Sequence, residues 1–260
     1  MPELPEVESY ARYFERHALG RRIARVRVLD ERILATRREV LVRTLRGRTF
    51  ERVRRHGKHL FAAAGDRWLR LHFGMSGDLT AWDGHGPVPR FARVVFDFDD
   101  GSHLAFEDMR LFGVVELVKD PDLFVRERGL GPDPLDASFD LRAFRALLAG
   151  RRGAIKSLLM TQEAIAGIGN LYADEMLYQT GIHPRRSVDT LSPAEAAALF
   201  RAMKRVLRGA VKRRVAGRDD PARWLIDHRE EDAPCPICGG TIRRTVVFGR
   251  TTYFCGKHQG

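Results

Sequence analysis

Apolar positions in the first half of the chain recur at the spacing of one helix and then of many short strands. Apolar residues every three or four positions from Leu4 to Phe14 predict a helix from about Pro5 to Leu19. A second helix is predicted at 36–45. Alternating or short apolar runs, separated by Gly, Asp and Pro clusters, predict strands at 21–30, 49–54, 58–63, 67–73, 78–82, 91–98, 102–106 and 113–118. Several short strands at this spacing favour a β-sandwich or barrel over a parallel sheet.

The second half of the chain has helical periodicity after a Gly- and Pro-rich stretch at 129–136. Ser192 is a predicted N-cap, and a hairpin is predicted to turn at Phe248 and Gly249. The helices are expected at 141–149, 154–160, 171–180 and 193–214, and the hairpin strands at 241–247 and 250–254. We therefore predict an α+β fold with a β-sandwich domain at 1–132, a helical domain at 133–228 and a hairpin domain at 229–260.

Composition indicates a folded protein with an anionic partner. Hydrophobic residues make up 44% of the chain and charged residues 30%, which is a normal globular balance. The formal net charge is +11, which suggests a polyanion, although an arginine-rich proteome would produce the same surplus. No apolar run is long enough for a membrane span, and the N-terminus lacks a secretory signal.

The first residues can supply a nucleophile. Pro2 is small enough for Met1 to be removed, which would leave a secondary amine. An α-amino group titrates near 7.7–8.0, against about 10.4 for lysine, so more of it is neutral near pH 7. A secondary amine that attacks an aldehyde carbon forms a cationic iminium ion suited to elimination. Glu3 and Glu6 are candidates for proton transfer, although a Pro- and Glu-rich stretch also suits an ordinary helix start.

The three cysteines all lie in the last 26 residues, an odd and clustered set that favours metal binding over disulfides. Cys235, Cys238, Cys255 and His258 form the spacing C-x2-C-x16-C-x2-H. Such a pair of knuckles predicts one tetrahedral Zn²⁺. With four protein ligands and no open position, the metal is expected to be structural and not catalytic.

The opening string MPELPEVE resembles the N-terminal signature of the formamidopyrimidine-DNA glycosylase/endonuclease VIII family. Further motifs that resemble the family follow in family order, namely the basic turn 54–59, the loops 72–77 and 107–113, the stretch 154–156, GIGNLYADE with GIHP, and the cysteine hairpin. The resemblance covers the whole chain. It implies a base-excision-repair glycosylase with β- and δ-elimination activity at abasic sites, which acts on damaged double-stranded DNA as a cytoplasmic, nucleoid-associated monomer.

The resemblance also implies residue roles. Pro2 would be the nucleophile, Glu3 the acid/base and Glu6 a second candidate. Lys58 would be a fourth catalytic residue, which contacts phosphates beside the lesion. Met75, Arg110 and Phe112 would form a wedge that fills the space of the everted base. The remaining DNA contacts would be His72, Lys156, Asn170 and Arg250; glycines before the predicted helix at 171 also suit an anion by themselves.

Three departures from the family pattern leave alternatives open. Leu111 stands where relatives often have a second Arg, which bears on discrimination of the base opposite the lesion. His258 stands where Cys is usual. The span 215–234 is shorter than in members that act on oxidised purines, so the loop that covers the everted purine is expected to be absent. An endonuclease VIII-type preference for oxidised pyrimidines, a non-catalytic lesion-binding protein and a zinc-ribbon module with a protein partner are the alternatives.

Overall fold

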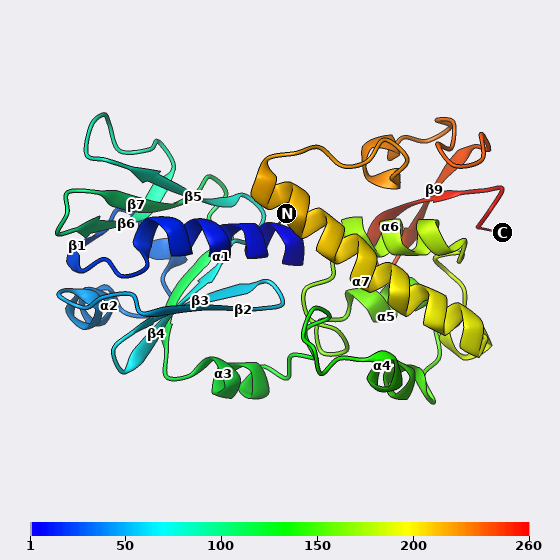
Figure 1. The fold of residues 1–260 in the computed structure, drawn as a ribbon, viewed down its shortest axis with the longest axis horizontal. Coiled ribbons are helices and arrows are strands. Elements are labelled where there is room, and N and C mark those ends of the chain that lie inside the picture. The colour runs from blue at the N-terminus through cyan, green and yellow to red at the C-terminus, as the bar shows by residue number, and fades with distance from the viewer. Residues whose placement is uncertain (1, 260) are drawn as a thin grey trace. The chain divides into compact units, whose positions relative to one another are not determined.

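The computed structural model describes residues 2–259, which fall into two compact units that divide between Gly129 and Leu130 (Figure 1). The boundary lies at the start of the stretch 129–136 that the sequence marked as a linker. The second unit contains both the helices and the C-terminal hairpin, and the finer division into three domains stays a prediction.

The first unit is a sandwich of two antiparallel four-stranded sheets, as predicted. One sheet has the order β1-β6-β7-β5, with bounds Ile23–Val28, Ala92–Phe98, His103–Asp108 and Gly77–Trp82. The other has the order β2-β3-β4-β8, with bounds Arg52–His56, His59–Ala64, Arg67–His72 and Val114–Val118. Each sheet buries alternating apolar side chains in the shared core.

Helix α1, Leu4–Ala18, packs against β2, β3 and β5 (Figure 1). Pro5 lies in its first turn, where the missing N–H costs nothing. Phe14 meets Phe50 edge to face, with ring centroids 4.9 Å apart, and so anchors the helix in the core. This packing fixes the residues immediately before the helix relative to the sandwich.

Three shorter helical segments complete the first unit: η1, Glu31–Ile33; α2, Arg38–Leu45; and α3, Pro121–Glu127. The prediction had no helix at η1 or at α3. Asp120 caps α3 by accepting the Leu123 N–H at 2.9 Å, and Pro121 opens it. This signal is local, and with only seven residues the periodic pattern is too short to reveal the helix.

The second unit contains α4, α5, α6, α7 and the hairpin β9–β10, all of which were predicted. Their bounds are Leu141–Leu148, Ile155–Met160, Asn170–Thr180, Pro193–Ala216, Ile242–Val247 and Arg250–Cys255. Two short turns, η2 (Val188–Thr190) and η3 (Leu225–His228), were not predicted. None of the helices described between residues 2 and 259 has the length and apolar character needed to cross a membrane.

Candidate functional site

The two N-terminal glutamates hold each other at the start of α1. The Glu3 N–H donates to Oε2 of Glu6 at 3.0 Å, and the Glu6 N–H donates back to the Glu3 side chain, so the pair forms a capping box. Glu3 is only 2% exposed and Pro2, the residue before it, is half-buried. Pro2, Glu3 and Glu6 thus lie at or beside the start of α1, and their catalytic roles stay predictions. The state of Met1 lies outside the described residues.

The turn that carries Lys58 is attached to the same helix. Arg55 is 7% exposed in its side chain, and its Nε lies 2.7 Å from Oε2 of Glu8 on α1. The Arg55 Nη1 also donates to the Gly57 carbonyl at 3.1 Å. Gly57 has φ +54, a conformation that favours glycine in this tight turn. Half-buried Lys58 therefore extends from a turn whose position is set by α1.

The loops 73–77 and 109–113 lie against each other and present the predicted wedge. A side chain at Gly74 would come within 2.4 Å of the Phe112 backbone, so glycine is what permits this approach. Met75 is 42% exposed and Phe112 is 54% exposed. The Arg110 guanidinium lies 5.1 Å from the centre of the Phe112 ring. The structure thus gathers the three predicted wedge residues at one place on the first unit.

Asp108 joins these two loops, a role that the sequence reasoning missed. The side chain is fully buried. Its Oδ1 accepts from Ser76 Oγ at 2.5 Å and from the Arg110 N–H at 3.1 Å, while Oδ2 accepts the Gly113 N–H at 2.5 Å. The available signal was an aspartate two residues before Arg110, a spacing at which a carboxylate often accepts the backbone N–H.

His72 contacts the backbone of the loop that carries Met75. Its Nδ1 accepts the Gly74 N–H at 3.2 Å, and its ring lies 5.0 Å from that of His59. Burial, with smaller effects from Arg70 and Lys58, lowers the pKa of His72 to about 4. A neutral ring is what this acceptor role requires. A direct DNA contact by His72 stays a prediction.

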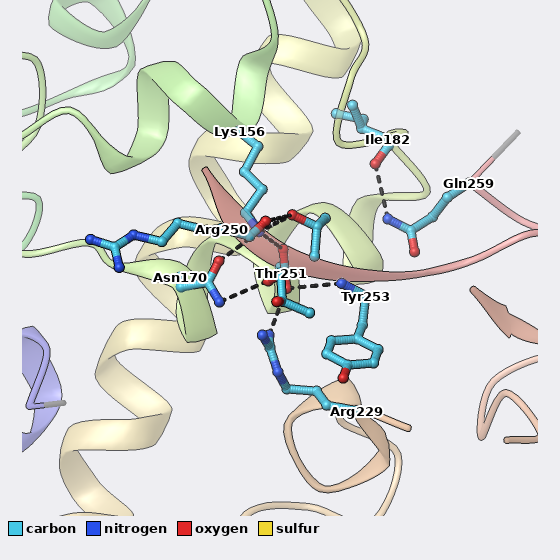
Figure 2. A network of polar contacts seen from close by, with 10 residues as sticks. Lys156, Asn170, Ile182, Arg229, Arg250, Thr251, Tyr253 and Gln259 are labelled. Atoms are coloured by element: carbon cyan, nitrogen blue, oxygen red, sulfur yellow. Dashed lines mark hydrogen bonds and ion pairs between the residues drawn. The ribbon is translucent and has the colours of Figure 1, made fainter. Parts of the chain in front are cut away.

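In the second unit, Lys156 lies inside a polar network and not on the surface (Figure 2). Its Nζ lies 2.7 Å from Asn170 Oδ1, 2.6 Å from Thr252 Oγ1 and 2.6 Å from Asp174 Oδ1. The side chain has no exposed surface, so it cannot reach a phosphate without leaving these partners. These contacts favour a positioning role for Lys156 toward Asn170, and the phosphate contact by Lys156 stays a prediction.

Asn170 and Arg250 remain near the surface around this network. The Asn170 amide lies at the start of α6, where its Nδ2 donates to the Thr251 carbonyl at 2.9 Å. Arg250 is exposed, and Figure 2 shows its side chain extending away from the buried lysine. A helix N-terminus and an exposed guanidinium, joined through the hairpin, can bind an anion.

Asp174 links the buried Lys156 to Arg229. Its Oδ2 lies 2.6 Å from Arg229 Nη1 and accepts the Tyr253 N–H at 3.2 Å. Sequence reasoning did not find Asp174, Arg229 or Thr252, because a buried aspartate inside a helix has no distinctive local pattern. Burial raises the pKa of Asp174, and the charges of Lys156 and Arg229 oppose this shift by favouring the carboxylate form.

The predicted metal ligands form one cluster. The ligand atoms of Cys235, Cys238, Cys255 and His258 all lie within 4.8 Å of one another. The Sγ atoms of Cys238 and Cys255 are 3.5 Å apart, close to the separation of about 3.8 Å expected for two thiolates at about 2.3 Å from one tetrahedral metal. His258 Nε2 lies 3.1 Å from the Tyr178 carbonyl, so Nδ1 is left to face the sulfur atoms. The cluster can hold a metal ion.

The span 215–234 is folded onto the second unit. Trp224 and Leu225 are buried, and the Trp224 ring lies beside Gly209 of α7. The Ile226 N–H donates to Oε2 of Glu175 at 3.2 Å, and burial raises the pKa of Glu175 to about 7. The span is therefore a packed segment with its own anchors.

Comparison with known proteins identifies the family. Residues 1–115 match the formamidopyrimidine-DNA glycosylase N-terminal domain, and residues 130–220 match the formamidopyrimidine-DNA glycosylase H2TH domain. The chain belongs to the formamidopyrimidine-DNA glycosylase family. Among its relatives, the formamidopyrimidine-DNA glycosylase of Symbiobacterium thermophilum is 38% identical over 276 positions, which cover 100% of this chain and 89% of that protein. The Streptococcus pneumoniae glycosylase is 35% identical, with 100% and 99% covered.

Solved structures of formamidopyrimidine-DNA glycosylases share the whole fold. The Lactococcus lactis enzyme, bound non-covalently to DNA that contains an abasic site, superposes with a TM-score of 0.89 at 29% identity and covers 99% of both chains. A structure of MutM in complex with DNA that contains carbocyclic 8-oxoguanine gives the same TM-score, identity and coverage. The fold class and the family predicted from the sequence are confirmed.

Proposed function

We propose that this formamidopyrimidine-DNA glycosylase family member excises oxidised bases from duplex DNA and cleaves the abasic site with its N-terminal proline amine. The observation that carries the proposal is the fixed Glu3 beside Pro2. Glu3 is 2% exposed and held by the Glu6 capping box at the start of a helix packed into the core. A positioned carboxylate next to a terminal amine pairs a nucleophile with an acid/base.

In the first step, the free amine of Pro2 attacks C1′ of the damaged nucleotide. The bond from C1′ to the base breaks, and the base leaves with its electron pair and receives a proton. Glu3 assists proton transfer to the departing base and to O4′ as the sugar ring opens, which leaves an iminium ion between Pro2 and C1′. Glu6 fixes the Glu3 backbone and is the second candidate for proton transfer.

In the second step, the iminium ion acts as an electron sink. Loss of a proton from C2′ expels the 3′ phosphate, and a further elimination expels the 5′ phosphate. Hydrolysis then returns the amine. Removal of Met1 is a requirement of this scheme, because an acylated proline nitrogen has no nucleophilic lone pair.

DNA binding is assigned to cationic and amide groups on both units. Lys58, Asn170 and Arg250 would contact phosphates, and Met75, Arg110 and Phe112 would fill the space of the everted base. The exposure of the wedge and of Arg250 supports this assignment, as do the related enzymes solved with DNA. Lys156 would orient Asn170 from within the network.

The metal cluster is assigned one structural Zn²⁺. Three thiolates and one imidazole are the ligand set that zinc prefers in closed sites, and no ligand position is left for a substrate. Bound zinc would hold the hairpin that carries Arg250, and its role in catalysis would be indirect.

For substrate choice, the short span 215–234 favours formamidopyrimidines and oxidised pyrimidines over 8-oxoguanine. This span is anchored by Leu225 and by the Glu175 bond to Ile226. Without a loop over the base, a bulky purine would have fewer hydrogen bonds to its distinguishing edge.

The test uses labelled duplexes that carry formamidopyrimidine, 8-oxoguanine, an oxidised pyrimidine, uracil or a preformed abasic site. We expect strand cleavage at the first and third lesions and at the abasic site, and slower cleavage at 8-oxoguanine. Glu3→Gln should lose base excision, whereas Glu15→Gln, on the same helix, should match the wild type. Rapid 8-oxoguanine excision would refute the substrate assignment alone. No cleavage of any lesion or abasic duplex would refute the enzyme assignment.

A further inference from the structure

The turn between β9 and β10 places a bulky residue where glycine or asparagine is normal. Val247 pairs with Arg250, so Phe248 and Gly249 form a two-residue hairpin turn. Both have positive φ, +52 for Phe248 and +66 for Gly249. Hairpins of this kind prefer Asn-Gly or Gly-Gly, because side chains larger than Asn are strained at positive φ. The turn itself therefore does not explain a phenylalanine.

Core packing does not explain Phe248 either. Its side chain is 62% exposed, more than any other large hydrophobic residue described between 2 and 259. Val246, two positions earlier, is 57% exposed. Phe248 thus combines a strained backbone conformation with an aromatic side chain that is exposed to water. This combination is typical of a surface that binds a partner.

The charges around the turn identify the kind of partner. Arg250 follows directly after the turn, and Arg185 binds the hairpin by donating from Nη2 to Thr245 Oγ1 at 2.7 Å and to the Val246 carbonyl at 3.1 Å. Within residues 2–259, neither guanidinium lies within ion-pair distance of a carboxylate. The hairpin and the adjoining Arg185 therefore present two arginines, without carboxylate partners among the described residues, together with an exposed aromatic ring. This surface is complementary to nucleic acid, in which phosphates lie next to apolar sugar faces and base edges.

The hairpin is also held rigidly behind the turn. Asn170 Nδ2 donates to the Thr251 carbonyl at 2.9 Å, and the buried Lys156 Nζ lies 2.6 Å from Thr252 Oγ1 (Figure 2). These bonds couple the turn to the start of α6. A ring on a rigid support loses little conformational entropy when it binds.

We propose that the Phe248 ring packs against deoxyribose and base edges of the damaged duplex, next to the phosphate that Arg250 contacts. The proposal rests on the proposed function in so far as Arg250 binds DNA. It makes Phe248 a DNA-positioning residue outside the wedge and outside the catalytic residues at the N-terminus.

Phe248→Asn tests this, because asparagine accepts positive φ and removes only the ring. Binding to a duplex with a tetrahydrofuran abasic analogue would be measured by fluorescence anisotropy over a salt series. We expect Kd to rise about tenfold, within the range reported for lost base–aromatic stacking. The slope of log K against log salt should stay unchanged, since the ring has no charge. Thermal stability should stay equal or rise.

Two further variants make the result specific. Phe248→Tyr keeps the aromatic ring and should bind with wild-type affinity. Leu29→Asn removes another exposed apolar side chain and should have no effect on affinity. Wild-type affinity in Phe248→Asn would overturn the proposal and leave a protein partner as the explanation of the ring. That outcome is distinct from failure of the proposed function, in which the wild type itself neither binds the abasic duplex nor cleaves it.

Discussion

The Nζ atom of Lys156 lies 2.7 Å from Oδ1 of Asn170, and the lysine itself is fully buried. The lysine fixes the amide orientation, because an ammonium group can only donate and therefore selects the amide oxygen. The Asn170 NH₂ group then donates to the Thr251 carbonyl. The family resemblance predicts phosphate contacts by both residues, and this geometry favours Asn170 as the contact and Lys156 as its support.

Lys156→Met should therefore act through stability and not through counterion release. Loss of the ammonium leaves the buried Asp174 with Arg229 as its cation, and breaking a buried pair costs about 3–5 kcal/mol. We expect the free energy of unfolding to fall by about 3 kcal/mol and DNA affinity to fall with it. Lys119→Met, at an exposed position, is the matched control.

The salt dependence of DNA binding separates the two roles. Lys58→Ala and Arg250→Ala should each reduce the slope of log K against log salt by about 0.9, because each removes a phosphate contact. Lys156→Met should leave the slope at its wild-type value. A reduction by Lys156→Met equal to that of Arg250→Ala would show that the lysine reaches the phosphate after all.

The wedge predicts a difference between two substrates. Met75→Ala or Phe112→Ala should slow excision of a damaged base by about tenfold or more, since the unstacked gap costs a few kcal/mol when nothing fills it. Cleavage of a preformed abasic site should change much less. Single-turnover rates on both duplexes measure this. Equal losses on the two substrates would indicate a folding defect instead.

Asp108→Asn provides a control for the wedge geometry. One amide nitrogen would face an N–H that the carboxylate now accepts, either from Arg110 or from Gly113. The two loops should separate although no wedge side chain is changed, so base excision should fall as in Phe112→Ala. Wild-type excision by Asp108→Asn would show that the loops hold together without it.

Sequence patterns predicted the elements of this fold because most are long or strongly periodic. Helix α1, the sandwich strands, α7 and the hairpin follow from apolar spacing and from caps such as Ser192. The metal ligands follow from their spacing, since two knuckles define a tetrahedral site. Such signals depend only on residues that are close in the chain, so one sequence is enough to detect them.

The supporting residues could not be predicted, because their partners are distant in the chain. Asp108 contacts Ser76 across 32 positions, and Lys156 contacts Thr252 across 96. Burial of a lysine also has no sequence signature, so Lys156 was expected to contact a phosphate. Positions that depend on long-range hydrogen bonds require the fold itself.

Removal of one metal ligand should weaken both the fold and DNA binding. Cys238→Ser should release the metal and loosen the β9–β10 hairpin, because structural zinc contributes about 10–16 kcal/mol of apparent folding free energy in small fingers. Metal analysis of the purified wild type should find one zinc per chain. A stable wild-type protein without stoichiometric zinc would contradict the structural assignment.

The pKa of His72 predicts a stability change at acidic pH. Its folded pKa is about 4, below the unfolded value of about 6.5, so the unfolded chain binds a proton that the folded chain excludes. The contribution of neutral His72 to the free energy of unfolding is therefore fully present above pH 6.5, and it is lost as the pH falls toward 4. The buried His59, whose pKa is also lowered by burial, adds to this loss.

His72→Asn should reduce this pH dependence, because the amide oxygen can still accept the Gly74 N–H but does not titrate. Urea unfolding between pH 4 and 7 should show a slope smaller by up to about 1.4 kcal/mol per pH unit. An unchanged slope would show that the His72 ring is protonated in the folded protein.

Borohydride trapping tests the central claim most directly. The protein is incubated with a duplex that contains an abasic site, the iminium ion is reduced, and the adduct is located by mass spectrometry. The account predicts a covalent adduct on the peptide that begins with Pro2, and none when the N-terminus is extended by a tag. An adduct on a lysine instead, or no adduct with a wild-type protein that has lost Met1, would contradict the assignment of Pro2 as the nucleophile.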